Sequence, residues 1–224
     1  MRYQTVTFLR NERAALLPLL TAILIFTVIY GTLEDPLRYS FSNLGNYFRY
    51  RDWYITWAFV TGFSRYFSVM SLFELTDFQC GYARLSIMGV PFFLTVTALI
   101  PSVKQMPFLQ DLHRWTTFFF VMCMIFSVHP FLLWLAEKKP HLNKLLLQWQ
   151  LVILGGSMFL LIFQGQTGMF ELWFFVMTLS LLISLAWSLF GEAVEEAAFY
   201  ERSTKGRVKK RFPGGKPAGK MHGP

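Results

Sequence analysis

A single arginine stands near the centre of an apolar stretch, residues 53–75, that is long enough to cross a bilayer. A guanidinium group stays charged when buried and can bind a phosphate through two parallel hydrogen bonds. This residue, Arg65, is accompanied at helical spacing by the hydroxyl side chains of Thr61, Ser64 and Ser68. A charge at mid-bilayer costs at least about 2.5 kcal/mol, so the polar face should look into protein or water rather than into lipid.

Two roles are open for this arginine. It can bind a lipid phosphate or an anionic solute, with Ser64, Ser68 and Thr61 beside it and Arg114 as a second cation at the outer face. Alternatively, it bonds only to hydroxyl groups and backbone carbonyls and locks the helices together. The sequence does not decide between the two roles.

A second set of polar residues lies at the ends of the expected spans. His113 with Asp111 or Glu171 could form an acid–base pair, because imidazole titrates near neutral pH and a carboxylate can fix its tautomer. The simpler interpretation is that these side chains anchor the helix ends at the membrane interface. The residues that could converge over the outer mouth of the bundle are Ser42, Asn43, Asp111, His113, Arg114, Gln164, Gln166 and Glu171.

The sequence indicates no metal site and no cofactor. The four histidines show neither the HExxH motif nor a pair at i, i+4 spacing. His129, followed by a proline, is expected to be a packing histidine inside the fourth span. Cys80 and Cys123 fall in different environments, which makes a disulfide or a zinc site improbable.

The composition explains what positions these residues. Hydrophobic residues make up 54 % of the 224 residues and charged residues only 15 %, which excludes an ordinary soluble domain. We expect an all-α, polytopic integral membrane protein. The six predicted transmembrane helices are residues 14–33, 53–75, 84–100, 113–136, 145–163 and 169–190.

The basic residues predict the orientation of these spans. Fifteen Lys and Arg fall at the chain ends and in alternate loops, against five in the opposite loops, so both termini are predicted to be cytoplasmic. The formal charge of +8 therefore reflects topology and not nucleic-acid binding. Residues 1–13 are the cytoplasmic N-terminus, residues 14–191 the membrane domain, and residues 192–224 a helical extension followed by a basic tail.

The tail is predicted to be disordered from Arg202 to Pro224, because it combines eight Lys or Arg with glycines and prolines and has no acid. Each basic residue gains roughly 1 kcal/mol against an anionic membrane surface. Residues 202–220 are therefore expected to lie on the inner leaflet, although they could act only as a lock on the topology.

Three short motifs give a resemblance. Ser42-Asn43-Leu44-Gly45 follows the first span, Pro101-Ser102 closes the third, and His113 opens the fourth. With these motifs the chain resembles, over most of residues 14–190, an uncharacterised six-span family of bacterial membrane proteins that is remotely similar to the DRAM-type and FRAG-type proteins. That family has an acid soon after the proline, where this chain has Ser102-Val103-Lys104, so the resemblance implies architecture and no activity.

As the function we expect a non-enzymatic membrane protein of the cell membrane. Its intramembrane polar pocket around Arg65 would bind a lipid headgroup or an acidic side chain of another membrane protein, in envelope assembly or lipid homeostasis. An alternative is a membrane-embedded enzyme acting on a lipid-like substrate, with His113 and Glu171 as the acid–base residues. A third possibility is a transporter of small solutes or anions along the Arg65 face.

Overall fold

The computed structural model describes residues 6–103, 105–165 and 167–211, with side chains as far as residue 203. Within these residues the chain is all-α, as predicted. The elements are α1 (Val6–Gly31), α2 (Phe41–Tyr47), α3 (Arg51–Thr76), α4 (Gly81–Leu99), α5 (Pro107–Lys138), the short 3₁₀ helix η1 (Pro140–Leu142), α6 (Asn143–Gln164) and α7 (Gly168–Arg211).

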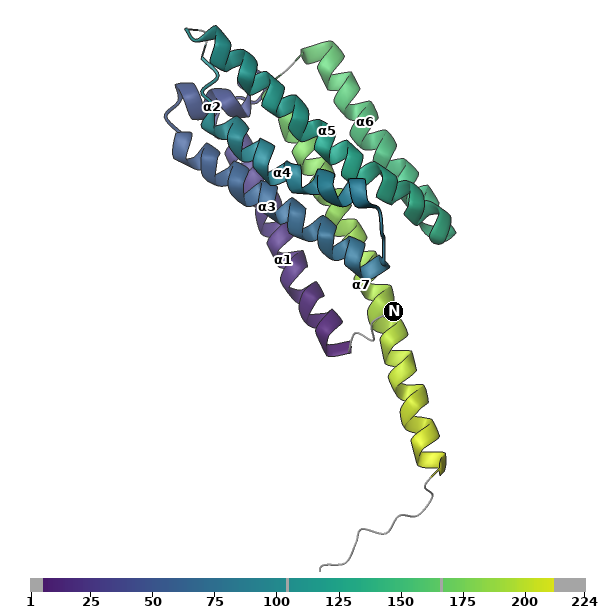
Figure 1. Ribbon diagram of the computed structural model, residues 1–224. Helices are drawn as coiled ribbons and strands as arrows, with labels where there is room; N and C mark the ends of the chain where they lie inside the picture. The colour runs from purple at the N-terminus through teal and green to yellow at the C-terminus, as the bar shows by residue number, and fades with distance from the viewer. Residues whose placement is uncertain (1–5, 104, 166, 212–224) are drawn as a thin grey trace, which may run out of the picture.

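The six long helices alternate in direction along one bundle (Figure 1). The short helix α2 lies at the end where α3 and α5 begin, and we call this the α2 end. The α3–α4 turn and the α5–α6 connection lie at the other end, which we call the turn end. The N-terminal end of α1 also lies there, and α7 continues past the turn end as a single projecting helix (Figure 1).

Helix α3 lies in the middle of the packing, in contact with α1, α2, α4 and α7. It buries eleven residues, whereas α6 packs mainly on α7 and buries only Leu146 and Ile153. The helix that carries Arg65 is therefore the one most enclosed by other helices, and α6 is peripheral.

Local sequence signals explain where several helices begin and end. The Ser40 side chain accepts a hydrogen bond from the Asn43 backbone N–H at 3.2 Å and so caps α2. Asp77, with φ of 59°, ends α3 in the left-handed conformation that commonly terminates helices. Pro107 stands in the first turn of α5, where its missing N–H has no cost.

Five described helices are long and apolar enough to cross a membrane, namely α1, α4, α5, α6 with η1, and α7. The predicted second span, α3, is not among them, although its 26 residues give it sufficient length. Tyrosine, tryptophan, hydroxyl side chains and Arg65 lower its hydropathy. The structure therefore has the six long helices that the sequence predicted, but only five of them are apolar enough to qualify as membrane spans.

Two boundaries differ from the sequence-based expectation. The connection between the first two predicted spans contains the short helix α2, which the sequence did not predict. The side chain of Ser40 caps its N-terminus. The basic tail was predicted to be disordered from Arg202, and this is wrong as far as Arg211, since α7 continues to that residue. Residues 212–224 of the tail lie outside the described residues.

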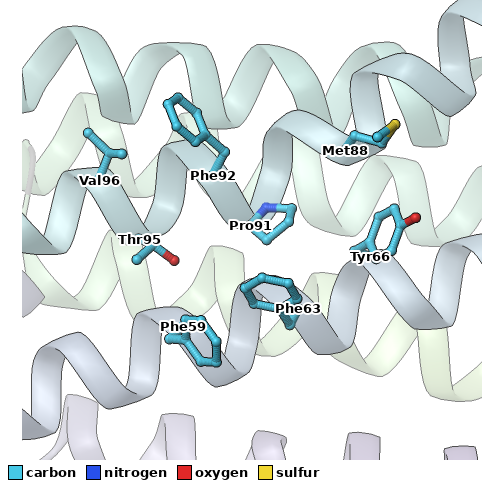
Figure 2. Close-up of a pocket in the computed structure, with 8 residues that line it drawn as sticks. All are labelled: Phe59, Phe63, Tyr66, Met88, Pro91, Phe92, Thr95 and Val96. Carbon is cyan, nitrogen blue, oxygen red and sulfur yellow. The ribbon is translucent and has the colours of Figure 1, made fainter.

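The seam between α3 and α4 depends on Gly62. A Cβ atom placed on Gly62 would lie 2.8 Å from the Cα atom of Pro91, so the two backbones touch at this point. Figure 2 shows Pro91 between the rings of Phe63 and Phe92. Around the contact lies an open groove of about 420 Å³, lined by Phe59, Phe63, Tyr66, Met88, Pro91, Phe92, Thr95 and Val96.

We expect Gly62→Ala to lower the free energy of unfolding by about 1–3 kcal/mol, because the added methyl group forces α3 away from α4. The matched control is Gly155→Ala in α6, where a Cβ atom meets nothing within 4 Å. The control should be neutral or more stable by about 0.5–1 kcal/mol. Thermal unfolding in detergent, followed by tryptophan fluorescence, measures both. Equal melting temperatures for the two variants would contradict the backbone contact.

Candidate functional site

Arg65 lies inside the bundle. Its side chain is 0 % exposed, and its Nη2 donates a hydrogen bond to the backbone carbonyl of Phe175 in α7 at 3.1 Å. The guanidinium carbon also lies 4.9 Å from the centroid of the Phe175 ring, within the range of a cation–π interaction. The prediction that this guanidinium is sheltered within the protein is confirmed.

Most of the hydrogen-bonding capacity of this guanidinium is unused. Arg65 Nε and Nη1 are buried and have no partner among the described residues, and the same holds for Thr61 Oγ1, one turn earlier on α3. Each unsatisfied buried donor costs about 1–3 kcal/mol, and more when the group is charged. Arg65 therefore keeps two nitrogens, and Thr61 its hydroxyl group, without a hydrogen-bond partner among the described residues.

No acidic side chain of the described residues is a counter-ion of Arg65. All thirteen Asp and Glu of the sequence fall within the described residues, and none of them forms an ion pair with Arg65. Buried charges in proteins are ordinarily paired or bound to a ligand. Among the described side chains Arg65 therefore has no acidic partner.

The neighbouring hydroxyl groups do not solvate the cation. Ser64 Oγ donates to the Val60 carbonyl at 2.7 Å, and Ser68 Oγ donates to the Ser64 carbonyl at 2.6 Å, so both serve their own helix. Thr178 Oγ1 donates to the Phe175 carbonyl at 3.2 Å and thus shares the acceptor of Arg65. Of the alternative in which Arg65 bonds only to hydroxyl groups and backbone carbonyls, the structure shows the backbone carbonyl but no serine hydroxyl as a partner.

Two aromatic clusters enclose Arg65 along the axis of α3. Trp57 precedes it by eight residues and Phe73 follows it by eight, which places these two backbone positions about 12 Å from that of Arg65 along the helix, while the Phe175 ring lies against the guanidinium itself. The α2-end cluster consists of Tyr30, Phe41, Tyr54, Trp57, Phe120 and Phe175. The turn-end cluster consists of Phe73, Phe78, Phe131 and Trp134.

Buried hydrogen bonds fix the α2-end cluster. Trp57 Nε1 donates to Thr27 Oγ1 at 3.0 Å, and Tyr30 donates its hydroxyl hydrogen to the Phe41 carbonyl at 2.9 Å. The six rings are almost fully buried. They lie between Arg65 and the α2 end, where the sequence predicted polar residues around an outer mouth, so no polar pocket opens from that end to Arg65 among the described residues.

Glu171 holds α2 in position. Its Oε2 accepts a hydrogen bond from the Phe41 backbone N–H at 2.6 Å, and the Met169 N–H donates to the Pro36 carbonyl at 2.7 Å. Ser42 Oγ lies 3.0 Å from Ser40 Oγ. The first turn of α7 therefore binds the connection between α1 and α2. Of the other residues predicted at this mouth, Gln166 lies outside the described residues.

His113 and Arg114 are engaged elsewhere. His113 Nδ1 lies 3.1 Å from the Ile100 carbonyl, so the histidine joins the start of α5 to the end of α4. Arg114 forms an ion pair of 3.2 Å with Asp111, both side chains being 64 % exposed. Within the described chain no hydrogen bond links His113 to Glu171 or Asp111, and Arg114 is not part of the buried Arg65 site. The proposed acid–base pair is not assembled.

The other histidine and cysteine residues considered in the sequence form no binding site among the described residues. His129 is exposed on α5, so the expectation of a buried packing histidine is wrong. Cys80 and Cys123 are free thiols. Among residues 6–103, 105–165 and 167–211 no group of three His, Cys, Asp or Glu side chains is placed to hold a metal ion.

Sequence reasoning missed the acceptor of Arg65 and the rings around it. Phe175 accepts the hydrogen bond through its backbone carbonyl, and every residue has such a carbonyl, so the residue type does not reveal the acceptor. The aromatic clusters combine residues that are far apart in sequence. The one available signal was the placement of Trp57 and Phe73 eight residues before and after Arg65.

Comparisons with protein-family models, with curated proteins and with solved structures give no match. The resemblance to a six-span bacterial family therefore stays a prediction.

We expect Glu171→Ala to destabilise the protein by about 1–3 kcal/mol, because it leaves the Phe41 N–H buried without an acceptor. Glu171→Gln retains an acceptor oxygen and should lose much less. Melting temperatures of the two variants in detergent test this role. Equal damage from both substitutions would show that the carboxylate does more than accept this hydrogen bond.

Proposed function

We propose that the protein is an integral membrane protein with six spans and both termini in the cytoplasm. Five apolar helices support this arrangement, with α3 packed among them as the sixth crossing. The alternating directions of the long helices bring the start of α1 to the end from which α7 projects (Figure 1). The excess of Lys and Arg at that end, fifteen against five, supports a cytoplasmic location.

Its proposed function is to bind an anionic group at Arg65, without performing catalysis. The observation that carries this proposal is the full burial of a guanidinium with two unpartnered nitrogens and no acid of the chain paired with it. Arginine keeps its charge when buried, so the site cannot relieve its cost by losing a proton. Binding an anion would offset the free-energy cost of burying the guanidinium charge. The site should therefore strongly prefer negatively charged ligands.

A lipid headgroup is the ligand that the proposal favours. Anionic phospholipids are abundant around any membrane protein, and phosphate oxygens match the hydrogen-bonding geometry of a guanidinium. In this proposal the protein acts in lipid homeostasis or in assembly of the cell envelope. The acid–base residues required by an enzymatic alternative are held by backbone groups or by surface ion pairs.

The basic tail would add a second contact with lipid. Arg202 lies on the part of α7 that projects beyond the bundle, and the basic residues that follow it reach Lys220. In the proposed orientation Arg202 lies on the cytoplasmic side, where α7 projects away from the bundle (Figure 1), and a basic residue gains roughly 1 kcal/mol only within a Debye length of the anionic inner leaflet.

Native mass spectrometry of the detergent-purified protein tests the proposal. We expect the wild-type protein to retain an anionic lipid or other anion, and Arg65→Ala to bind it at least tenfold more weakly, since a hydrogen bond to a charged group contributes about 1.5–3 kcal/mol. Arg65→Gln, which keeps most of the side-chain volume, should show the same loss.

The control is Arg38→Gln, which removes an exposed arginine paired with Asp35. It should retain the ligand. His113→Ala should also retain it, whereas an enzyme with His113 as its acid–base residue would lose turnover in that variant and keep it in Arg65→Ala. Retention of the same anion by folded Arg65→Ala and Arg65→Gln would refute the proposal.

A further inference from the structure

The groove between α3 and α4 is open toward the outside of the bundle. Three of the side chains that line it, Phe59, Met88 and Phe92, are between 49 and 61 % exposed. Apart from the hydroxyl groups of Tyr66 and Thr95, its lining side chains are apolar. In the proposed membrane arrangement this opening faces the hydrocarbon core of the bilayer, so the molecules that reach it there are lipid chains.

The groove lies within one leaflet. Helix α4 has 19 residues and is about 28 Å long, which nearly equals the thickness of a hydrocarbon core, about 30 Å. Of the lining residues on α4, Val96 lies about 4.5 Å and Met88 about 16.5 Å from the level of Leu99, at the α2 end of the helix. The groove therefore begins just inside the boundary of the hydrocarbon core and ends near mid-bilayer. This is the range of depth that an acyl chain of that leaflet occupies, since each leaflet supplies about 15 Å.

The groove also has the size of a single chain. Its volume is about 420 Å³. A water molecule occupies roughly 30 Å³ in the liquid, and a methylene group is of similar size, so the groove has room for roughly 14 such groups. A helical segment 12 Å long and 10 Å across would need roughly 900 Å³. A partner helix could therefore insert only side chains, whereas one hydrocarbon chain can lie along the whole groove.

Contacts within the protein hold the groove in shape. The backbone contact between Gly62 and Pro91 fixes α3 against α4 at this level. Phe59 and Phe63 pack together with ring centroids 4.5 Å apart on the α3 side, and Phe92 stands on the α4 side (Figure 2). A chain in the groove therefore contacts two helices, whereas a chain beside a single convex helix contacts only one. Dispersion contacts add up along the chain, and in a bilayer packing of this kind decides which surface is preferred.

Thr95 adds a polar group to this lining. Its Oγ1 is buried and has no hydrogen-bond partner within the described part of the chain, and Figure 2 shows it on the side of α4 that faces α3. Thr95 lies about 6 Å from the level of Leu99, at the end of the groove nearer the headgroups. A buried hydroxyl group without a partner is destabilising. The carbonyl of an ester-linked acyl chain is an acceptor close to this end, so the hydroxyl favours a chain that carries an ester.

From these observations we infer that the groove binds one acyl chain of a membrane phospholipid, in the leaflet at the α2 end, with Thr95 donating a hydrogen bond to its ester carbonyl. The inference rests on the proposed membrane arrangement and not on anion binding. The two sites are separate, because Arg65 is 0 % exposed and is hydrogen-bonded to α7, whereas the groove opens outward between α3 and α4. The bound chain fills the space between these two helices.

Photolabelling of the full-length protein tests the inference. The protein is reconstituted in phosphatidylcholine vesicles that contain a phosphatidylcholine with a diazirine in the middle of one chain, and mass spectrometry of the digested protein then gives the labelled fraction of each helix. Phe92 in α4 is compared with Met158 in α6, because they are 61 % and 54 % exposed and lie about 10 Å and 9 Å from the α2 end of their helices. We expect at least about threefold more label around Phe92, since a chain in the groove packs against two helices.

Two substitutions alter the groove, and a third is their control. Val96→Trp places a large side chain in the groove and should lower the label around Phe92 to the level around Met158. Thr95→Val keeps the side-chain volume but removes the hydroxyl group, and it should lower the label at least about twofold, because the chain loses its hydrogen bond. Val152→Trp, at an exposed position of α6, should leave the label around Phe92 unchanged. Only variants that elute as a single species in detergent are compared.

Equal labelling around Phe92 and Met158 in the wild-type protein would overturn the inference, because the groove would then hold a chain no better than a plain helix surface does. Less label around Phe92 would also overturn it, and would indicate that a protein surface such as a second copy covers the groove. Labelling that stays unchanged in both Val96→Trp and Thr95→Val would likewise overturn it. Absence of label from α4 and α6 alike would overturn the membrane arrangement together with the inference. Anion retention at Arg65 is measured separately, so its failure is distinguishable from all of these outcomes.

Discussion

The structure depends on a permanent positive charge held where the surroundings are almost entirely apolar. Arg65 has one backbone acceptor, the Phe175 carbonyl, and one aromatic face against it. Neither contact carries a full negative charge. The helices around α3 provide the burial, but they leave the charge uncompensated, and an apolar packing residue at this position would be easier to accommodate. Burial of this charge therefore lowers the stability of the fold unless a bound group compensates it.

The arrangement of the other helices follows from this requirement. Helix α3 has the weakest membrane-type hydropathy of the six long helices, and it is the one most covered by its neighbours. Gly62 allows the backbone of α4 to touch the backbone of α3. The hydrogen bond from the Phe41 N–H to the Glu171 carboxylate fixes α2 against α7. The apolar surface that these contacts leave outside is typical of helices that face lipid.

The sequence predicted the class of the fold and the enclosure of Arg65, because hydropathy and helical spacing depend on residues close together in the chain. It did not predict α2 or the aromatic clusters, and it assigned Arg114 and the serine hydroxyls to a site that they do not join. These errors arise where segments far apart in the sequence come into contact, or where a side chain can hydrogen-bond either to a backbone carbonyl or to another side chain. Ser64 and Ser68 find carbonyls in their own helix first, which periodicity alone cannot reveal.

The distance in sequence between Arg65 and its acceptor has a consequence for biogenesis. The two residues are separated by 110 positions, and Phe175 stands on α7, the last of the described helices to be synthesised. At about 5–20 residues per second, the arginine waits roughly 5–20 s after its own synthesis before that helix is available. During this interval the nascent chain carries an unshielded cation, so early insertion intermediates need temporary protection by the translocon, a chaperone or a locally hydrated bilayer.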